Sequence, residues 1–142
     1  MRKFRSERKA FLTISKTPSE RALAKEVYAS WFIFLSYSAL VYESAILPPN
    51  RIPHFLLNAN DKVIHATLYF LLFGAALWAF KNSRWIYSRV LPEKSALVYC
   101  AIMGIVTETS QIFVPGRSCD AADWTADVLG AVLASWPTRR LA

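Results

Sequence analysis

Acidic and amide side chains gather around a single Pro-Gly turn near residue 115, among residues that are largely apolar. Residues 108–127 read ETSQIFVPGRSCDAADWTAD. Carboxylates at helical spacing can act as general bases, hold a cation or pair with basic groups. A charged residue at the centre of a membrane helix costs roughly 3 kcal/mol on insertion scales, so such residues mark a functional hypothesis. The polar residues in question are Glu108, Gln111, Asp120, Asp123 and Asp127.

Long apolar runs indicate which elements carry these side chains. Residues 27–47 read VYASWFIFLSYSALVYESAIL and contain one charge, Glu43. About 20 apolar residues span the hydrocarbon core of a bilayer, so the sequence predicts a membrane protein rather than a soluble nucleic-acid binder. A cleaved signal peptide is not expected, because the charged leader is long and no small-residue cleavage pattern follows the run.

The expected fold class is all-α, a polytopic membrane bundle of four transmembrane helices. A basic leader, residues 1–26, precedes a single membrane domain, residues 27–142. The segment TPSE reads as a capping box with Thr17 as its N-cap, from which a helix can run through the first span. Pro48 and Pro49 are expected to end that helix.

Three further spans are expected after the first. The second covers residues 63–80 with Asn60 as its cap, and the third covers residues 95–114. The fourth runs from about residue 120 to residue 136 and carries two aspartates, so a helix lying on the membrane surface is the alternative. Small residues at four-residue spacing favour a packed span.

Basic residues set the expected orientation. Fourteen of the 17 Lys and Arg residues fall on one side of the four spans, and three fall on the other: Arg51, Lys62 and Arg117. An excess of Lys and Arg marks the cytoplasmic side, so both termini are predicted to be cytoplasmic. Cys100 and Cys119 then lie near opposite membrane faces, too far apart for a disulfide bond.

With this topology, polar residues of three helices reach matching depths at the outer membrane face. Gly104, Glu108 and Gln111 share one helix face, and Asp120, Asp123 and Asp127 share another. The sequence therefore predicts a polar pocket open to the outside, which Glu43 can join. The residues expected to bind a ligand there are Asp61, Lys62, His65, Tyr69, Glu108, Gln111, Arg117, Asp120, Asp123 and Asp127.

Several of these residues have a structural reading beside the functional one. Arg117 is either a contact for an anionic group or an ion-pair partner of Asp120 and Asp123. His65 is either a proton carrier or metal ligand, or a hydrogen-bonded packing residue. Asp123 is either a general base or a first-turn carboxylate favoured by the helix dipole.

Three spaced motifs resemble those of VanZ-like membrane proteins. They are DKVIHATLYF, ETSQIFVPGR and DAADWTADVLG, which together cover residues 61–130. The resemblance implies a small helical membrane domain in the cytoplasmic membrane of a bacterium, and it links the chain to reduced susceptibility to the glycopeptide teicoplanin. Asp127 departs from the pattern, since the family usually has Asn there, and Ala134 stands where Gly is common.

Three functions remain open at this point. The first is a non-enzymatic envelope protein that binds a polar or anionic group of a lipid head group, a cell-wall precursor or a glycopeptide. The second is an interfacial hydrolase or transferase, with Glu108 or Asp123 as general base and His65 as acid or metal ligand. The third is a structural lock in a small scaffold. The sequence favours a non-enzymatic function over catalysis. Membrane lipids are the expected partners, and no metal, cofactor or nucleic acid is expected.

Overall fold

The computed structural model describes residues 18–51, 60–83 and 91–139, and within these ranges it contains helices and no strand. The long helices are α2 (Pro18–Ile46), α4 (Asp61–Asn82), α6 (Pro92–Gln111) and α7 (Ala121–Arg139). A short 3-10 helix, η1 (Pro49–Arg51), follows α2. The all-α expectation is confirmed. Thr17 and the start of the leader lie outside the described residues, and residues 18–26 form the first turns of α2.

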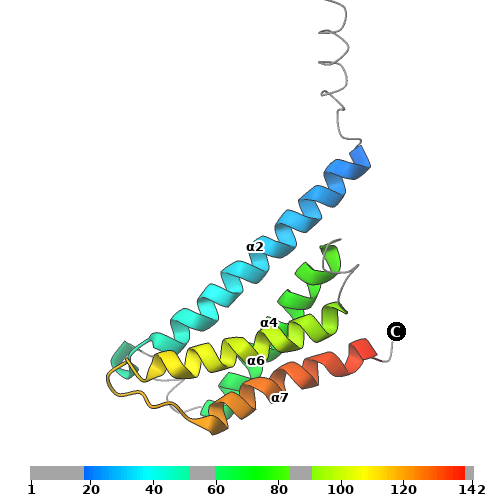
Figure 1. Ribbon diagram of the computed structural model, residues 1–142. Helices are drawn as coiled ribbons and strands as arrows, with labels where there is room; N and C mark the ends of the chain where they lie inside the picture. The colour runs from blue at the N-terminus through cyan, green and yellow to red at the C-terminus, as the bar shows by residue number, and fades with distance from the viewer. Residues whose placement is uncertain (1–17, 52–59, 84–90, 140–142) are drawn as a thin grey trace, which may run out of the picture.

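Helices α4, α6 and α7 form the compact part of the fold, and α2 leans against it (Figure 1). The most extensive contact is between α4 and α7. Helix α2 contacts α4 and α6, and its buried positions start at Ser30 and end at Val41. Its first turns extend away from the other helices (Figure 1). The three-helix unit therefore has to supply most of the packing around any site.

Local sequence signals explain most of the helix boundaries. The Asn60 side chain accepts a hydrogen bond from the Lys62 amide (3.1 Å), which confirms Asn60 as the cap of α4. Pro92 occupies the first turn of α6, where its missing amide donor costs nothing. Helix α2 ends at Ile46, ahead of the two prolines, as expected.

Two predicted helix ends are wrong. Helix α6 ends at Gln111 rather than at residue 114. Before Pro115 the helix gives way to tight turns, in which each backbone amide donates to the carbonyl three residues earlier. Gly116 then adopts a positive φ of 81°, which a glycine accommodates without strain. Helix α7 continues past Trp136 and through Pro137 to Arg139.

Part of the apolar core is an aromatic cluster at the end of the bundle away from the Pro115-Gly116 turn. Rings of Trp31, Phe34, Phe80 and Tyr99 pack edge to face or tilted, with centroids 4.8 to 6.4 Å apart. Trp31 contributes to this cluster and is only partly exposed. The two cysteines are free, as expected, with Cys100 buried and Cys119 exposed.

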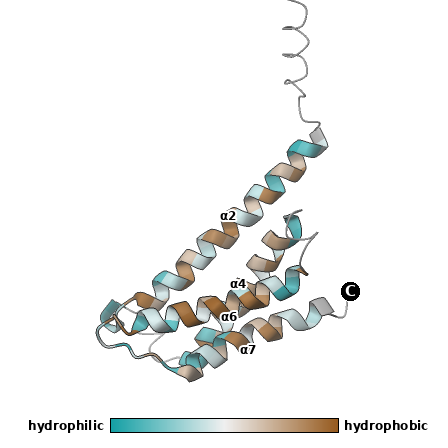
Figure 2. Ribbon diagram, in the orientation of Figure 1, coloured by the Kyte–Doolittle hydropathy of each residue, from teal (hydrophilic) through white to brown (hydrophobic). Residues whose placement is uncertain are grey.

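Large apolar side chains cover the outside of all four helices, whereas several polar side chains are buried inside. Exposed examples are Phe32 on α2, Leu71 on α4, Ile102 on α6 and Leu133 on α7. Hydrophobic residues dominate the middle of the helices (Figure 2). Two of the described helices, Ser19–Ile46 and Asp61–Asn82, are long and apolar enough to cross a membrane. Helices α6 and α7 carry Glu108, Asp123 and Asp127 on their buried faces.

A backbone contact between α4 and α7 sets the distance between these two helices. A Cβ atom added to Gly130 would lie 2.8 Å from the Cα atom of Ala66 and would overlap the carbonyl of that residue. Glycine is therefore required for this approach, as small residues are at close helix crossings in membranes. Small residues at four-residue spacing predict a packed fourth helix, and Gly130 is one of these residues in close contact with α4.

We expect Gly130→Ala to destabilise the protein by at least ~2 kcal/mol, because a rigid backbone has to move to admit the methyl group. Gly74→Ala is the matched control, since no atom lies within 4 Å of its added Cβ. That substitution should be neutral or stabilising by up to ~1 kcal/mol through helix propensity. Thermal unfolding of both variants in the same detergent measures the difference, and equal melting temperatures would contradict the assigned contact.

Candidate functional site

The contact between α4 and α7 brings basic residues of α4 against acids of α7. Lys62 Nζ donates to Asp120 Oδ2 (2.9 Å) and forms a second, closer ion pair with Asp123. One turn deeper, His65 Nδ1 lies 2.9 Å from Asp127 Oδ1. Lys62, His65 and Ala66 thus meet Asp123, Asp127 and Gly130 in register along one helix-helix contact.

Asp120 directly precedes α7 and caps its first turn. Its Oδ1 atom accepts from the Ala122 amide (2.8 Å), which is the geometry of an N-cap. This amide, followed by the Lys62 ammonium, holds the pKa of Asp120 below its ordinary value. Its backbone amide donates to Glu108 Oε2 (2.9 Å), so α6 also fixes the start of α7. Asp120 is therefore an ionised helix cap rather than a free ligand.

Further polar side chains lie in the interior of the bundle, below the more exposed side chains of Lys62 and Asp120. Glu108, Gln111, Asp123 and Asp127 are all buried, and Asp127 is completely inaccessible to solvent. Among the described residues, Glu108 Oε1, Gln111 Nε2 and Asp127 Oδ2 are buried and have no hydrogen-bond partner. Such atoms are unusual in folded proteins, because an unpaired buried polar group loses the hydrogen bonds it made to water.

Tyr69 lies deeper and takes part in a local hydrogen-bond chain. Its hydroxyl lies 3.0 Å from Thr107 Oγ1, which in turn donates to the Gly104 carbonyl (2.9 Å). Thr107 was missed by sequence reasoning, although its position between Gly104 and Gln111 on one face of α6 could have revealed it. Trp124 was missed as well, and its indole nitrogen donates to the Ala101 carbonyl (3.1 Å).

Arg117 points away from the acids and toward α2. Its Nε atom donates to the Leu47 carbonyl (3.3 Å), and Nη2 lies 3.5 Å from the Ser44 carbonyl. These carbonyls belong to the C-terminal end of α2, where a cation is also favoured by the helix dipole. The ion pairs to Asp120 and Asp123 in the described part of the chain come from Lys62 instead. Glu43 is exposed on α2.

We use the name polar cluster for the residues at the start of α4, the end of α6 and the start of α7. Its members grade from exposed at the rim to buried at the base. Tyr69 sits below the cluster and Arg117 beside α2. The polar cluster consists of Asp61, Lys62, His65, Glu108, Gln111, Asp120, Asp123 and Asp127.

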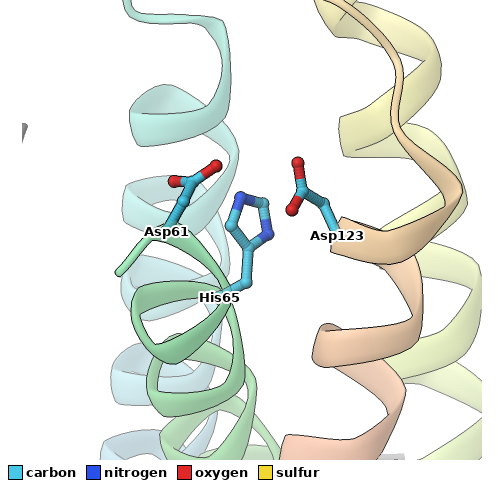
Figure 3. A group of neighbouring side chains, drawn as sticks. All are labelled: Asp61, His65 and Asp123. Atoms are coloured by element: carbon cyan, nitrogen blue, oxygen red, sulfur yellow. The ribbon is translucent and has the colours of Figure 1, made fainter. Parts of the chain in front are cut away.

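Two overlapping groups within the polar cluster have the composition of metal ligands. Asp61, His65 and Asp123 offer ligand atoms within 4.8 Å of one another, and so do His65, Glu108 and Asp127. Figure 3 shows the first group, with the His65 ring between Asp61 of the same helix and Asp123 of α7. The second group lies deeper. Both groups that could hold a cation therefore include the His65 imidazole.

The chemistry available to the polar cluster follows from its charges. Five carboxyl groups face one lysine and one histidine, so the described part of the cluster is acidic. An ionised Asp127 accepts from His65 Nδ1, which leaves Nε2 of the neutral ring with a lone pair. A neutral imidazole oriented by a buried carboxylate can accept a proton or bind a metal ion.

Comparison with known proteins identifies the family. The sequence model of the family VanZ/LLP1 matches residues 10–141. The chain belongs to the VanZ/LLP1 family. A relative of this VanZ/LLP1 protein, an uncharacterized protein of Schizosaccharomyces pombe, is 33% identical over 113 residues, which cover 80% of this chain and 62% of the yeast protein. No solved structure matches significantly. Family membership and two apolar helices make this a membrane-associated protein.

The Lys62–Asp123 ion pair should be energetically coupled, whereas the Lys81–Glu93 pair should not. Asp123 has a side chain only 9% exposed, so removal of Lys62 leaves a buried carboxylate without its cation. The control pair is 3.9 Å apart and more exposed. We expect Lys62→Met to lower the melting temperature and Asp123→Asn to restore much of the loss.

A double-mutant cycle in detergent measures this coupling, with Lys81→Met and Glu93→Gln as the second cycle. The control cycle should be additive within error. Additive effects of Lys62→Met and Asp123→Asn would contradict the ion pair as the partner of the buried acid.

Proposed function

We propose that this VanZ/LLP1 protein spans the membrane four times, with both termini in the cytoplasm, and binds the polar head group of an envelope lipid at the outer face. The observation that carries the proposal is the grading of the polar cluster from a solvent-exposed rim to a buried base. Asp61 and Lys62 lie at the rim, and Gln111 at the base has a buried amide nitrogen without a partner among the described residues. A ligand at the rim can therefore compete for hydrogen bonds that the protein leaves partly unsatisfied.

Helix lengths and exposed residues support four spans. Helices α6 and α7 have 20 and 19 residues, which correspond to about 30 and 28 Å at 1.5 Å per residue. These lengths match the hydrocarbon core of a bilayer. Ile105 and Val106 on α6, and Leu129 and Val132 on α7, are exposed to the surroundings. Their acids face the other helices, where polar groups in membrane proteins are expected.

Charge balance favours a ligand that carries an amine. The acids outnumber the basic groups of the polar cluster, Lys62 is already paired, and Arg117 donates to carbonyls of α2. A purely anionic ligand would meet mainly carboxylates, whereas in a ligand with both an amine and a phosphate the amine can contact the exposed Asp61 at the rim. Phosphatidylethanolamine has both groups, and it also suits a family with a relative in a yeast. The bacterial inner membrane stays a prediction.

The topology can be tested through the exposed Cys119, since the other cysteine is buried. A membrane-impermeant maleimide added outside intact cells should label Cys119. Lys81→Cys in a Cys119→Ser background is the control, because residue 81 lies at the opposite end of α4 and should be protected. Labelling of Cys119 only after the membrane is permeabilised would overturn the orientation.

The ligand can be tested by native mass spectrometry of the full chain released from nanodiscs. We expect retention of phosphatidylethanolamine over phosphatidylglycerol by about 10-fold, a difference of roughly 1.4 kcal/mol in binding. Asp61→Asn should remove most of this preference because the amine loses its carboxylate. Lys81→Ala, at the opposite end of the bundle, should leave it unchanged.

Two competitors distinguish the other envelope ligands. Teicoplanin and a lipid-linked cell-wall precursor are added separately to the same nanodiscs. Binding of either with the same dependence on Asp61, and without retained phosphatidylethanolamine, would replace the proposed ligand. Phosphatidylglycerol retained in preference to phosphatidylethanolamine would contradict the amine argument.

The hydrogen bond between His65 and Asp127 favours a second candidate function, an interfacial hydrolase or transferase. The aspartate orients the ring so that Nε2 can act as a general base toward a group bound at the rim. Asp123 and Glu108 are the other candidates for acid–base roles. Release of head group or fatty acid from nanodisc lipid by the purified chain, abolished in His65→Gln, would favour this function over binding alone.

A further inference from the structure

The deeper of the two ligand groups has the features of a metal site. We propose that His65, Glu108 and Asp127 bind a divalent transition-metal ion of the Zn²⁺ or Mn²⁺ class. Their ligand atoms already lie within 4.8 Å of one another, and they come from three different helices, α4, α6 and α7. Such a site lies beyond the head-group binding proposed above and does not depend on it.

Unpartnered carboxylate oxygens are the first observation that points to a cation. Glu108 Oε1 and Asp127 Oδ2 are buried and without a hydrogen-bond partner among the described residues. Glu108 is 3% exposed and Asp127 is fully buried, so water does not readily replace the missing partners. A metal ion would satisfy both carboxylates at once, which hydrogen bonds from the surrounding residues do not.

Charge balance gives the second reason. Two carboxylates and one imidazole face each other in this group, and the nearby ammonium of Lys62 is engaged by Asp120 and Asp123. A divalent cation neutralises two carboxylates, and the neutral imidazole supplies a lone pair without adding charge. Binding then displaces the protons that the free groups carry, so affinity should fall as the pH is lowered.

Geometry is compatible with coordination by a single ion. Ligand atoms at about 2.0–2.2 Å from a metal lie about 3 to 4.4 Å from each other. The ligand atoms of the three residues lie within 4.8 Å of one another, so they need to move together only slightly to bind one ion. The hydrogen bond between His65 Nδ1 and Asp127 Oδ1 (2.9 Å) leaves His65 Nε2 and the unpartnered Asp127 Oδ2 as the atoms available to an ion. The imidazole selects transition metals over Mg²⁺ and Ca²⁺, which prefer ligand sets made of oxygen.

Gly104 explains how α6 accommodates the Asp127 carboxylate. A Cβ atom on Gly104 would lie 3.2 Å from Asp127 Oδ2 and 2.9 Å from Trp124 Cδ1. Without a side chain there, the unpartnered oxygen of Asp127 reaches the face of α6 that carries Glu108 one turn later. The Trp124 indole donates to the Ala101 carbonyl and lies beside Gly104 next to the Asp127 carboxylate.

The outer group, Asp61, His65 and Asp123, is the less suitable of the two. Lys62 already neutralises Asp123, and Asp61 is exposed at the start of α4 (Figure 3). Metal bound there would have to displace the lysine. Asp61 therefore provides a matched control, because its removal leaves all three proposed ligands intact.

The test uses the full chain in detergent, without a polyhistidine tag and after treatment with a chelator. Titration with Zn²⁺ is followed by calorimetry, and Co²⁺ is used as a spectroscopic substitute because its visible absorption reports coordination. We expect one ion per chain.

Two ligand variants and one control decide the outcome. Asp127→Asn and Glu108→Gln preserve the shape of the side chains, and the amide oxygen that the first introduces can still accept from His65, so both variants should fold. Each should weaken binding by at least about 10-fold, because an amide oxygen is a weaker metal ligand than a carboxylate. Asp61→Asn should change binding less than about 2-fold.

Several results would overturn the proposal. The wild-type chain would fail to bind Zn²⁺ stoichiometrically, or the Asp127→Asn and Glu108→Gln variants would bind it as tightly as the wild type does. Loss of Zn²⁺ binding in Asp61→Asn would also overturn the proposal. If one ligand variant fails to fold, as judged by helical circular dichroism, the other ligand variant and His65→Gln still decide the outcome. Because the probe is the metal alone, failure of lipid binding leaves this result unaffected.

Discussion

The close approach of α4 and α7 at Ala66 and Gly130 is the contact on which the polar cluster depends. It brings the two backbones near enough for a short aspartate side chain on α7 to reach α4. From that point toward the helix ends, Asp127 meets His65 and Asp123 meets Lys62 in successive turns. A larger residue at position 130 would separate the helices, and the two charged contacts would lengthen together.

The distribution of polarity is the reverse of that in a water-soluble helical protein. Large apolar side chains cover the outer surfaces of the described helices, and carboxylates lie between α4, α6 and α7. In a bilayer this arrangement is favourable, because lipid contacts the apolar residues while the acids find partners inside the bundle. Among the described residues, α2 and α4 are the helices that are long and apolar enough to cross a membrane by composition alone.

Within the acidic region, structural and available groups can be separated by their hydrogen bonds. Asp120 caps α7, Arg117 binds the end of α2, and Tyr69 is bonded to Thr107. The sequence alone leaves open whether Arg117 contacts an anion or pairs with acids, and its observed partners are carbonyl groups. Glu108, Gln111 and Asp127 keep buried atoms that have no partner in the described part of the chain. These three residues therefore have polar atoms available to bind a ligand or to take part in chemistry.

The sequence by itself determined the helices and the two polar faces, because helical periodicity and capping depend on residues close along the chain. It placed Glu108 and Gln111 on one buried face, and it found the Asn60 cap. It misjudged the end of α6, where a series of turns overrides an apolar run. Only the tertiary structure decided that Lys62 rather than Arg117 pairs with the acids of α7, and that Asp127 meets His65. Those choices follow from the α4–α7 distance and the direction of the chain after Gly116, which local spacing does not determine.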